Sequence, residues 1–128
     1  MSKLLSDNRF DLRIRDCKFG RGVFAGKDFA PKALIEVCPV LLFDKHEEHM
    51  AWLTSATNLG RYYFGWGDTH SALAFGYGSL YNHSKRPNAD YSCDIKSNEI
   101  VIFALKKIKK GDQIFVSYGY DPTKKHNV

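Results

Sequence analysis

Apolar and polar residues alternate along several segments of the chain, and a period of two residues is typical of strands with one buried face. Residues 10–15, Phe-Asp-Leu-Arg-Ile-Arg, show this alternation most clearly. We expect a strand there, broken by the glycines of residues 20–22 and followed by a second extended segment at residues 23–25. Residues 33–43 are rich in Leu, Ile and Val, so they predict one or two further strands.

The second half of the chain has the same extended character. Residues 90–93 and 99–105 predict two strands joined by a polar turn, and residues 113–118 predict a last strand. Residues 62–66, Tyr-Tyr-Phe-Gly-Trp, form a dense aromatic cluster. Aromatic residues in an extended segment either build the core or form the wall of a cleft.

One segment carries helix signals instead. Asp44 has the chemistry of an N-cap, and Glu47, three residues later, completes a capping box. We therefore expect a helix from Lys45 to about Thr57. The predicted fold class is mostly β with one or two short helices (α+β).

Length and composition limit the domain organisation. The sequence has 128 residues, of which 44% are hydrophobic and 14% aromatic, which is typical of a globular chain. A chain of this length fits one domain, which we place at residues 1–128, with flexible tails at residues 1–9 and 123–128.

The cysteines and the lack of long apolar runs indicate a cellular compartment. Cys17, Cys38 and Cys93 are far apart and form no CxxC pair, so we expect neither a zinc site nor a disulfide framework. No segment has the length and apolarity of a signal peptide or a membrane span. We expect an intracellular protein, cytoplasmic or, in a eukaryote, nuclear, with no membrane partner.

The formal net charge is +5, and Lys106 to Lys110 form the densest basic run. The run flanks a predicted turn at Gly111-Asp112, so we interpret it as the solvated end of a hairpin rather than as a nucleic-acid patch. Nucleic-acid binding through the aromatic cluster would need basic residues between the rings, and only Arg61 is beside it. We do not expect direct nucleic-acid binding.

The most informative stretch runs from Tyr77 to Asn88. An apolar, glycine-containing run over residues 72–81 turns abruptly polar at Asn82-His83-Ser84. Buried amide and imidazole groups need partners. They either bond to nearby backbone at the end of the segment or bind a ligand, and the first interpretation is the better one for this stretch alone.

Two other stretches change that balance. Gly-Arg-Gly-Val-Phe-Ala at residues 20–25 lies upstream, and Ile-Phe-Val-Ser-Tyr-Gly-Tyr at residues 114–120 lies downstream. Together with Asn-His-Ser at residues 82–84, and in this order, they resemble the SET domain family of protein-lysine methyltransferases. The resemblance covers roughly residues 10–122, and the spacing of the motifs also resembles that of the small single-domain members of viruses and bacteria.

This resemblance implies a fold and an activity. The fold would be the SET β-clip, with several small curved sheets and a C-terminal segment that threads beside the Asn-His-Ser stretch as a pseudoknot. The activity would be transfer of a methyl group from the cofactor S-adenosylmethionine to a lysine amine. The reaction needs a neutral amine in line with the methyl group, which a narrow aromatic channel next to a sulfonium favours.

The resemblance also assigns roles to single residues. Tyr118 would be the catalytic tyrosine beside the transferred methyl. The expected cofactor-binding residues are Gly20, Arg21, Gly22, Asn82, His83 and Tyr118. The expected walls of the lysine channel are Tyr63, Tyr91 and Tyr120, with Tyr91 at a position that limits methyl number in some relatives. No metal ligand is expected.

The sequence departs from the family pattern in two features that concern the lysine channel. No cysteine-rich zinc segment follows Tyr120, so the cleft would be closed by the tail, by a second copy in a homodimer or by the substrate. Val37-Cys38 stands where many relatives have a channel tyrosine. The expected partner is a protein that bears the target lysine, such as a histone or another basic protein. The alternatives are a catalytically inactive SET-like module that binds a protein partner and, last, a basic nucleic-acid-binding β domain.

Overall fold

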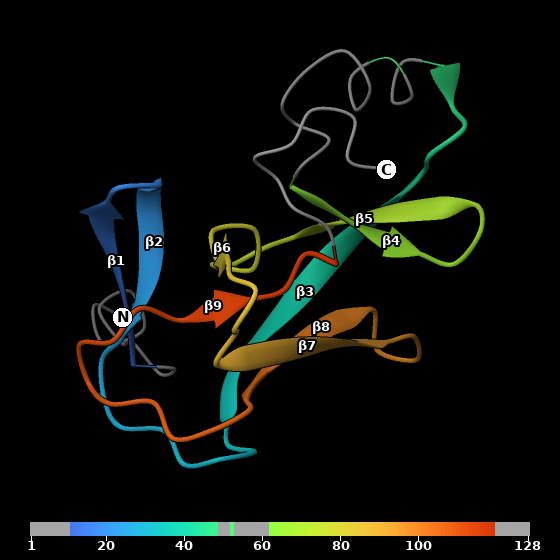
Figure 1. Cartoon of the computed structure of the whole chain (residues 1–128). Coiled ribbons are helices and arrows are strands. Elements are labelled where there is room, and N and C mark those ends of the chain that lie inside the picture. The colour runs from blue at the N-terminus through green and yellow to red at the C-terminus, as the bar shows by residue number, and fades with distance from the viewer. Residues whose placement is uncertain (1–10, 49–51, 53–61, 120–128) are drawn as a thin grey trace, which may run out of the picture.

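The computed structural model describes residues 11–48, 52 and 62–119. The described residues form nine strands in three sheets (Figure 1). In chain order they are β1 (Leu12–Cys17), β2 (Gly20–Ala25), β3 (Leu34–Asp44), β4 (Tyr63–Trp66), β5 (His70–Ala74), β6 (Asn82–His83), β7 (Ala89–Asp94), β8 (Glu99–Ala104) and β9 (Phe115–Val116).

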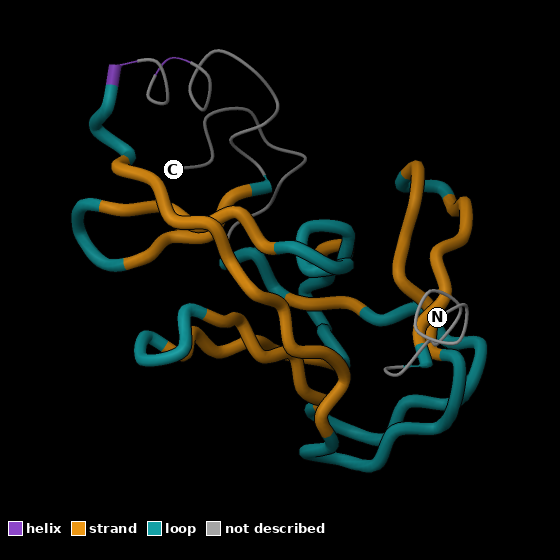
Figure 2. The backbone as a smooth tube through the Cα atoms, turned by 180° about the vertical axis from the view of Figure 1, so that it is seen from behind, coloured by secondary structure: helices purple, strands orange, loops and turns teal. Residues whose placement is uncertain are grey.

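The largest sheet has five strands in the order β4-β5-β3-β8-β7, and all its pairs are antiparallel. The long strand β3 belongs to both halves of this sheet. Its first part, from Leu34, pairs with β8, and its second part, to Asp44, pairs with β5. In Figures 1 and 2 the β1–β2 hairpin lies at one side of this sheet, and the short β6–β9 pair lies between them.

The period-two pattern of the sequence is the reason for these strands. In β8, residues 100, 102 and 104 are buried, and they alternate with partly exposed residues. Such alternation places one face of the strand in the core. The core joins all three sheets, and its large fully buried side chains are Tyr81, Leu12, Ile35, Ile100, Ile102, Ile108, Ile114, Val23 and Cys38.

The last segment of the chain crosses beside the Asn-His-Ser stretch. Strand β9 pairs in parallel with β6, with Asn82 opposite Phe115 and His83 opposite Val116. Asn88 holds the crossing in place, because its Nδ2 donates to the carbonyl of Gln113 at 3.0 Å and its Oδ1 accepts from the N–H of Phe115 at 2.8 Å. This crossing fixes the position of the residues that follow β9.

Two expectations about strand ends were wrong. The glycines at residues 20–22 do not break the strand, because the turn lies at residues 18–19 and β2 starts at Gly20. Gly20 has φ +100°, a conformation suited to glycine as the chain leaves the turn. The last strand is shorter than residues 113–118, because β6 offers only two residues to pair with.

The helix expected from Lys45 to about Thr57 lies largely outside the described residues. Asp44 Oδ1 accepts the backbone N–H of His46 at 2.9 Å, but residues 45–47 form a turn and a bend and the first helical residue is Glu48, so the prediction of Asp44 as the N-cap was wrong. In the described part of the chain, no helix is long and apolar enough to cross a membrane.

Candidate active site

Asn82 joins three segments that are far apart in the sequence. Its side-chain Nδ2 donates to the backbone carbonyl of Arg21 and to Oε1 of Gln113, both at 2.8 Å. These two strong bonds use both amide hydrogens, so the contact with the Cys17 sulfur at 3.6 Å is secondary. The start of β2, the Asn-His-Ser stretch and the approach to β9 therefore meet at one amide group.

Gly22 packs directly against the side chains of Asn82 and Gln113 at this junction. A Cβ at this position would collide with the Gln113 side chain and would lie 3.0 Å from Nδ2 of Asn82. The space beside Gly20 is different, because a Cβ there would meet no atom within 4 Å. Gly22 is thus required for close packing within the chain, whereas Gly20 leaves an open surface.

Tyr118 is fixed at both its backbone and its hydroxyl group. Its N–H donates to Nδ1 of His83 at 3.0 Å, and its hydroxyl donates to the backbone carbonyl of Tyr81 at 2.6 Å. Because Nδ1 of His83 is an acceptor, the proton of the neutral ring is on Nε2. The side chains of Asn82 and His83 thus bond within the protein, and the second of them positions Tyr118.

A buried carboxylate accepts hydrogen bonds from the segment that precedes Asn82. Glu36 in β3 is 4% exposed. Its two oxygens accept the hydroxyl of Tyr81 at 2.7 Å and the N–H of Tyr77 at 2.9 Å. Burial raises the pKa of the Tyr81 hydroxyl well above its ordinary value, and the charge of Glu36 raises it further. Tyr81 therefore remains a protonated donor to Glu36.

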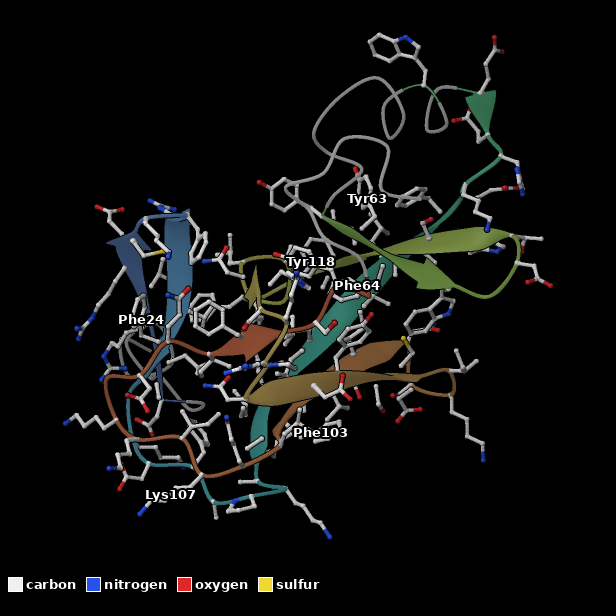
Figure 3. The ribbon with its side chains drawn as sticks, viewed as in Figure 1. Phe24, Tyr63, Phe64, Phe103, Lys107 and Tyr118 are labelled. Atoms are coloured by element: carbon white, nitrogen blue, oxygen red, sulfur yellow. The ribbon has the colours of Figure 1, made fainter. Side chains whose placement is uncertain are left out.

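An aromatic cavity of about 180 Å³ opens beside Tyr118. Figure 3 shows Tyr63, Phe64 and Tyr118 in this part of the molecule. The rings of Phe64 and Tyr91 meet edge to face, with centroids 5.0 Å apart. The cavity is lined by Tyr62, Tyr63, Phe64, Gly65, Gly78, Ser79, Tyr81, Tyr91, Val116 and Tyr118.

A wider hollow, of about 670 Å³ and with charged side chains in its lining, lies next to β1 and β2. It is lined by Ile14, Arg15, Asp16, Arg21, Gly76, Tyr77 and Leu80. The segment from Gly76 to Tyr81 contributes residues to both spaces, and different residues face each one. Ligand sites typically have volumes of about 300–1,000 Å³, so of these two spaces the wider hollow is the one that suits a cofactor. The aromatic cavity suits one linear side chain.

The structure brings most of the expected site residues into this region. Arg21 lines the wider hollow, and Tyr63, Tyr91 and Tyr118 line the aromatic cavity. Asn82 lies at the junction with β2, and His83 contacts Tyr118. Tyr120 lies outside the described residues.

Cys38, for which the resemblance to the family implies a channel tyrosine in many relatives, does not line the aromatic cavity. It is fully buried and packs against Gly78, where an added Cβ would lie 3.0 Å from its sulfur. A tyrosine at this position would need space that Gly78 and its neighbours occupy. The cavity obtains its aromatic walls from β4 and β7 instead.

Sequence reasoning missed Glu36 and Gln113 as residues that organise the site. Glu36 had a visible signal, because it is a single acidic residue inside the apolar run of residues 33–43. An acid there must find donors if the run is buried. Gln113 gave no such signal, since its role depends on the approach of Asn82 across the fold.

The comparisons with known proteins agree with this geometry. The SET domain family matches residues 20–119. The chain is 37% identical over 114 residues to the histone-lysine N-methyltransferase, H3 lysine-37 specific, of Schizosaccharomyces pombe, covering 87% of this chain and 75% of the relative. A crystal structure from Plasmodium falciparum, described as a histone methyltransferase, superposes with a TM-score of 0.68 at 29% identity. That match covers 89% of this chain and 97% of the other.

Proposed function

This chain belongs to the SET domain family and is a protein-lysine methyltransferase, and we propose that it takes the methyl group from S-adenosylmethionine. The observation that carries the proposal is the pair of hollows that share the segment from Gly76 to Tyr81. One is wide and has charged side chains in its lining, and the other is narrow and aromatic. The hydroxyl of Tyr118 is held against the backbone of this segment, at Tyr81.

Arg21 in the lining of the wider hollow and two residues next to Arg21, Gly20 in sequence and Asn82 through a hydrogen bond, fit the cofactor. Arg21 lines this hollow, and the open space beside Gly20 allows a ligand to approach the backbone. The amide hydrogens of Asn82 are used within the chain, so its Oδ1 is the group that we propose accepts a bond from the amino group of the cofactor. When bound, the cofactor supplies an electrophilic methyl group on a positively charged sulfur.

The aromatic cavity would hold the lysine side chain of the substrate. A lysine in water has a pKa of about 10.4 and is therefore an unreactive ammonium at neutral pH. Desolvation between the rings of Tyr63, Phe64 and Tyr91 favours the neutral amine, and a nearby positive charge favours it further. The Tyr118 hydroxyl donates a hydrogen bond to the carbonyl of Tyr81. The hydroxyl oxygen therefore remains an acceptor for weak CH···O contacts.

We propose that the substrate is a lysine in a basic protein such as a histone, as the name of the Schizosaccharomyces pombe relative indicates for that protein. The protein would then work inside the cell, with the histones. We also propose that residues 1–128 act as a single SET domain. The narrow cavity requires the target lysine to lie in an extended segment that can place one side chain inside it.

Transfer of a labelled methyl group to purified core histones tests the proposal. We expect the wild-type chain to label a histone, and mass spectrometry to place the label on a lysine. Tyr118→Phe should lower the rate about a hundredfold, because a misaligned reacting group costs about this factor. Tyr62→Phe, on the exposed rim of the cavity, is the matched control and should retain most activity. Equal rates for wild type and Tyr118→Phe would contradict the proposed role of Tyr118.

A further inference from the structure

Two loops that are far apart in the sequence form one surface, which we call the lysine end: residues 26–33 and 105–112. Phe29 and Ile108 exchange two backbone hydrogen bonds, of 2.8 and 2.9 Å. The N–H of Lys110 donates to Oδ1 of Asp28 at 2.8 Å. These bonds hold the loops side by side, so their side chains form a common surface.

The lysine end carries most of the net charge of the chain. Its six lysines and two aspartates give an excess of four positive charges, out of a formal net charge of +5 for all 128 residues. All six lysines are exposed. They are Lys27, Lys32, Lys106, Lys107, Lys109 and Lys110.

Among the described residues, the two aspartates of the lysine end form no ion pair with these lysines. The carboxylates of Asp28 and Asp112 accept backbone N–H groups, from Lys110 and Lys109 respectively. Within the described ranges, the one ion pair found joins Lys27 to Asp11 at 3.8 Å. No ion pair within residues 11–48, 52 and 62–119 involves the other five ammonium groups, which can attract an anionic partner.

The composition of this surface favours a phosphate backbone over a protein partner. Lysine is depleted in protein–protein interfaces, whereas it neutralises phosphates that follow one another about every 1.7 Å along duplex DNA. The aromatic residue of the lysine end, Phe29, is 2% exposed, so no ring is available to stack on unpaired bases. We propose that the lysine end binds the sugar-phosphate backbone of double-stranded nucleic acid, without reading its sequence.

In the sequence only the run from Lys106 to Lys110 stands out, and it predicts a solvated hairpin end without nucleic-acid binding. The fold adds Lys27 and Lys32 to that run. Figure 3 shows Lys107 far from Tyr63 and Tyr118, toward the opposite end of the molecule. A bound duplex would therefore leave the aromatic cavity accessible, and binding does not depend on methyl transfer.

Fluorescence anisotropy with a labelled DNA duplex of about 20 base pairs tests the inference. We expect a dissociation constant of about 10⁻⁴ to 10⁻⁶ M at physiological salt. If the lysines neutralise about four phosphates, log K should fall against log salt with a slope of about −4. Lys107→Glu/Lys110→Glu should weaken binding at least about tenfold, since it removes and reverses charges at the contact.

The matched control is Lys45→Glu/Lys96→Glu, which changes the net charge by the same amount at sites outside the lysine end. We expect its affinity to remain within about threefold of wild type, since these side chains lie away from the phosphates. Lys107→Gln/Lys110→Gln is a milder variant should the reversed charges prevent folding, and its affinity should fall in the same direction.

Three results would overturn the inference. The first is an equal loss of affinity in the two double variants, which would show a general charge effect. The second is a slope shallower than about −1, which would mean that hardly any phosphate is neutralised. The third is equally tight binding of phosphatidylserine vesicles or of single-stranded DNA. Calorimetry with S-adenosylhomocysteine on the same samples separates this test from the proposed function, because cofactor binding does not involve the lysine end.

Discussion

Glu36 is the one buried polar or charged residue found in the described part of the chain. A buried carboxylate is costly unless hydrogen bonds satisfy it, and here Tyr81 and Tyr77 supply the donors. Tyr81 in turn presents its carbonyl to the hydroxyl of Tyr118. A residue in the centre of the sheet thereby sets the position of the group next to the proposed reaction.

Tyr81→Phe tests this arrangement with little change in shape. The variant removes one donor from a buried carboxylate, and we expect the free energy of unfolding to fall by about 2 kcal/mol. Tyr62→Phe, at a position that is 47% exposed, should change it by less than about 0.5 kcal/mol. Urea denaturation measures both, and equal stabilities for the two variants would show that the Glu36 contact contributes nothing.

Cys38 makes a contribution to the pH dependence of the free energy of unfolding whose sign follows from its surroundings. Burial raises the pKa of the Cys38 thiol well above its ordinary value, and the nearby charge of Glu36 adds to the increase. Above about pH 8.5 an unfolded cysteine loses its proton, whereas the folded one keeps it. The folded state then binds more protons than the unfolded state, so stability falls as the pH rises.

We expect this effect to contribute about 2 kcal/mol of lost stability between pH 7 and pH 10. Cys38→Ala should remove that contribution, so its stability should fall less over the same range, whatever its stability at pH 7. Urea denaturation at a series of pH values measures the difference. Parallel curves for wild type and Cys38→Ala would refute the account of this thiol.

At the scale of elements, the alternation of apolar and polar residues predicted the strands well. The strands expected at residues 90–93 and 99–105 are β7 and β8, and the run over residues 33–43 is one strand, β3. The glycines of residues 20–22 were misjudged, because Gly22 serves close packing inside a strand rather than a turn. A single sequence does not separate these two uses of glycine.

The local sequence pattern could not predict which distant elements pair with each other. The parallel β6–β9 pair has two residues in each strand and depends on side-chain bonds from Asn82, His83 and Asn88. The Asn-His-Ser stretch indicated unusual polar groups at a core edge. It did not indicate which distant backbone would receive them.

Asn88→Ala should loosen β9 selectively. The variant leaves the Gln113 carbonyl and the Phe115 N–H without their partner, and we expect a loss of about 2 kcal/mol in the free energy of unfolding. Asn98→Gly is the control, because Asn98 has φ +55° in the exposed turn between β7 and β8 and glycine adopts that conformation readily. Hydrogen exchange should show faster exchange at β9 in Asn88→Ala alone, and equal exchange in both variants would contradict the role of Asn88.

At the scale of the whole molecule, the order of three motifs was enough to indicate the family, while the shape of the site came from the fold. The sequence placed the aromatic cluster of residues 62–66 either in the core or at a cleft. The structure uses it for both, with Trp66 buried and Tyr62, Tyr63 and Phe64 on the cavity. Two separate hollows that share one segment are a tertiary feature, and no local pattern contains them.

The central claim is that the wider hollow and Asn82 bind S-adenosylmethionine. Calorimetric titration with the product S-adenosylhomocysteine tests it without a protein substrate. We expect saturable binding to wild type, and an affinity at least about tenfold lower for Asn82→Ala, which loses the amide that joins β2 to the Asn-His-Ser stretch. Asn98→Gly should bind as wild type does. No binding to well-folded wild type, or equal binding to Asn82→Ala, would contradict the account.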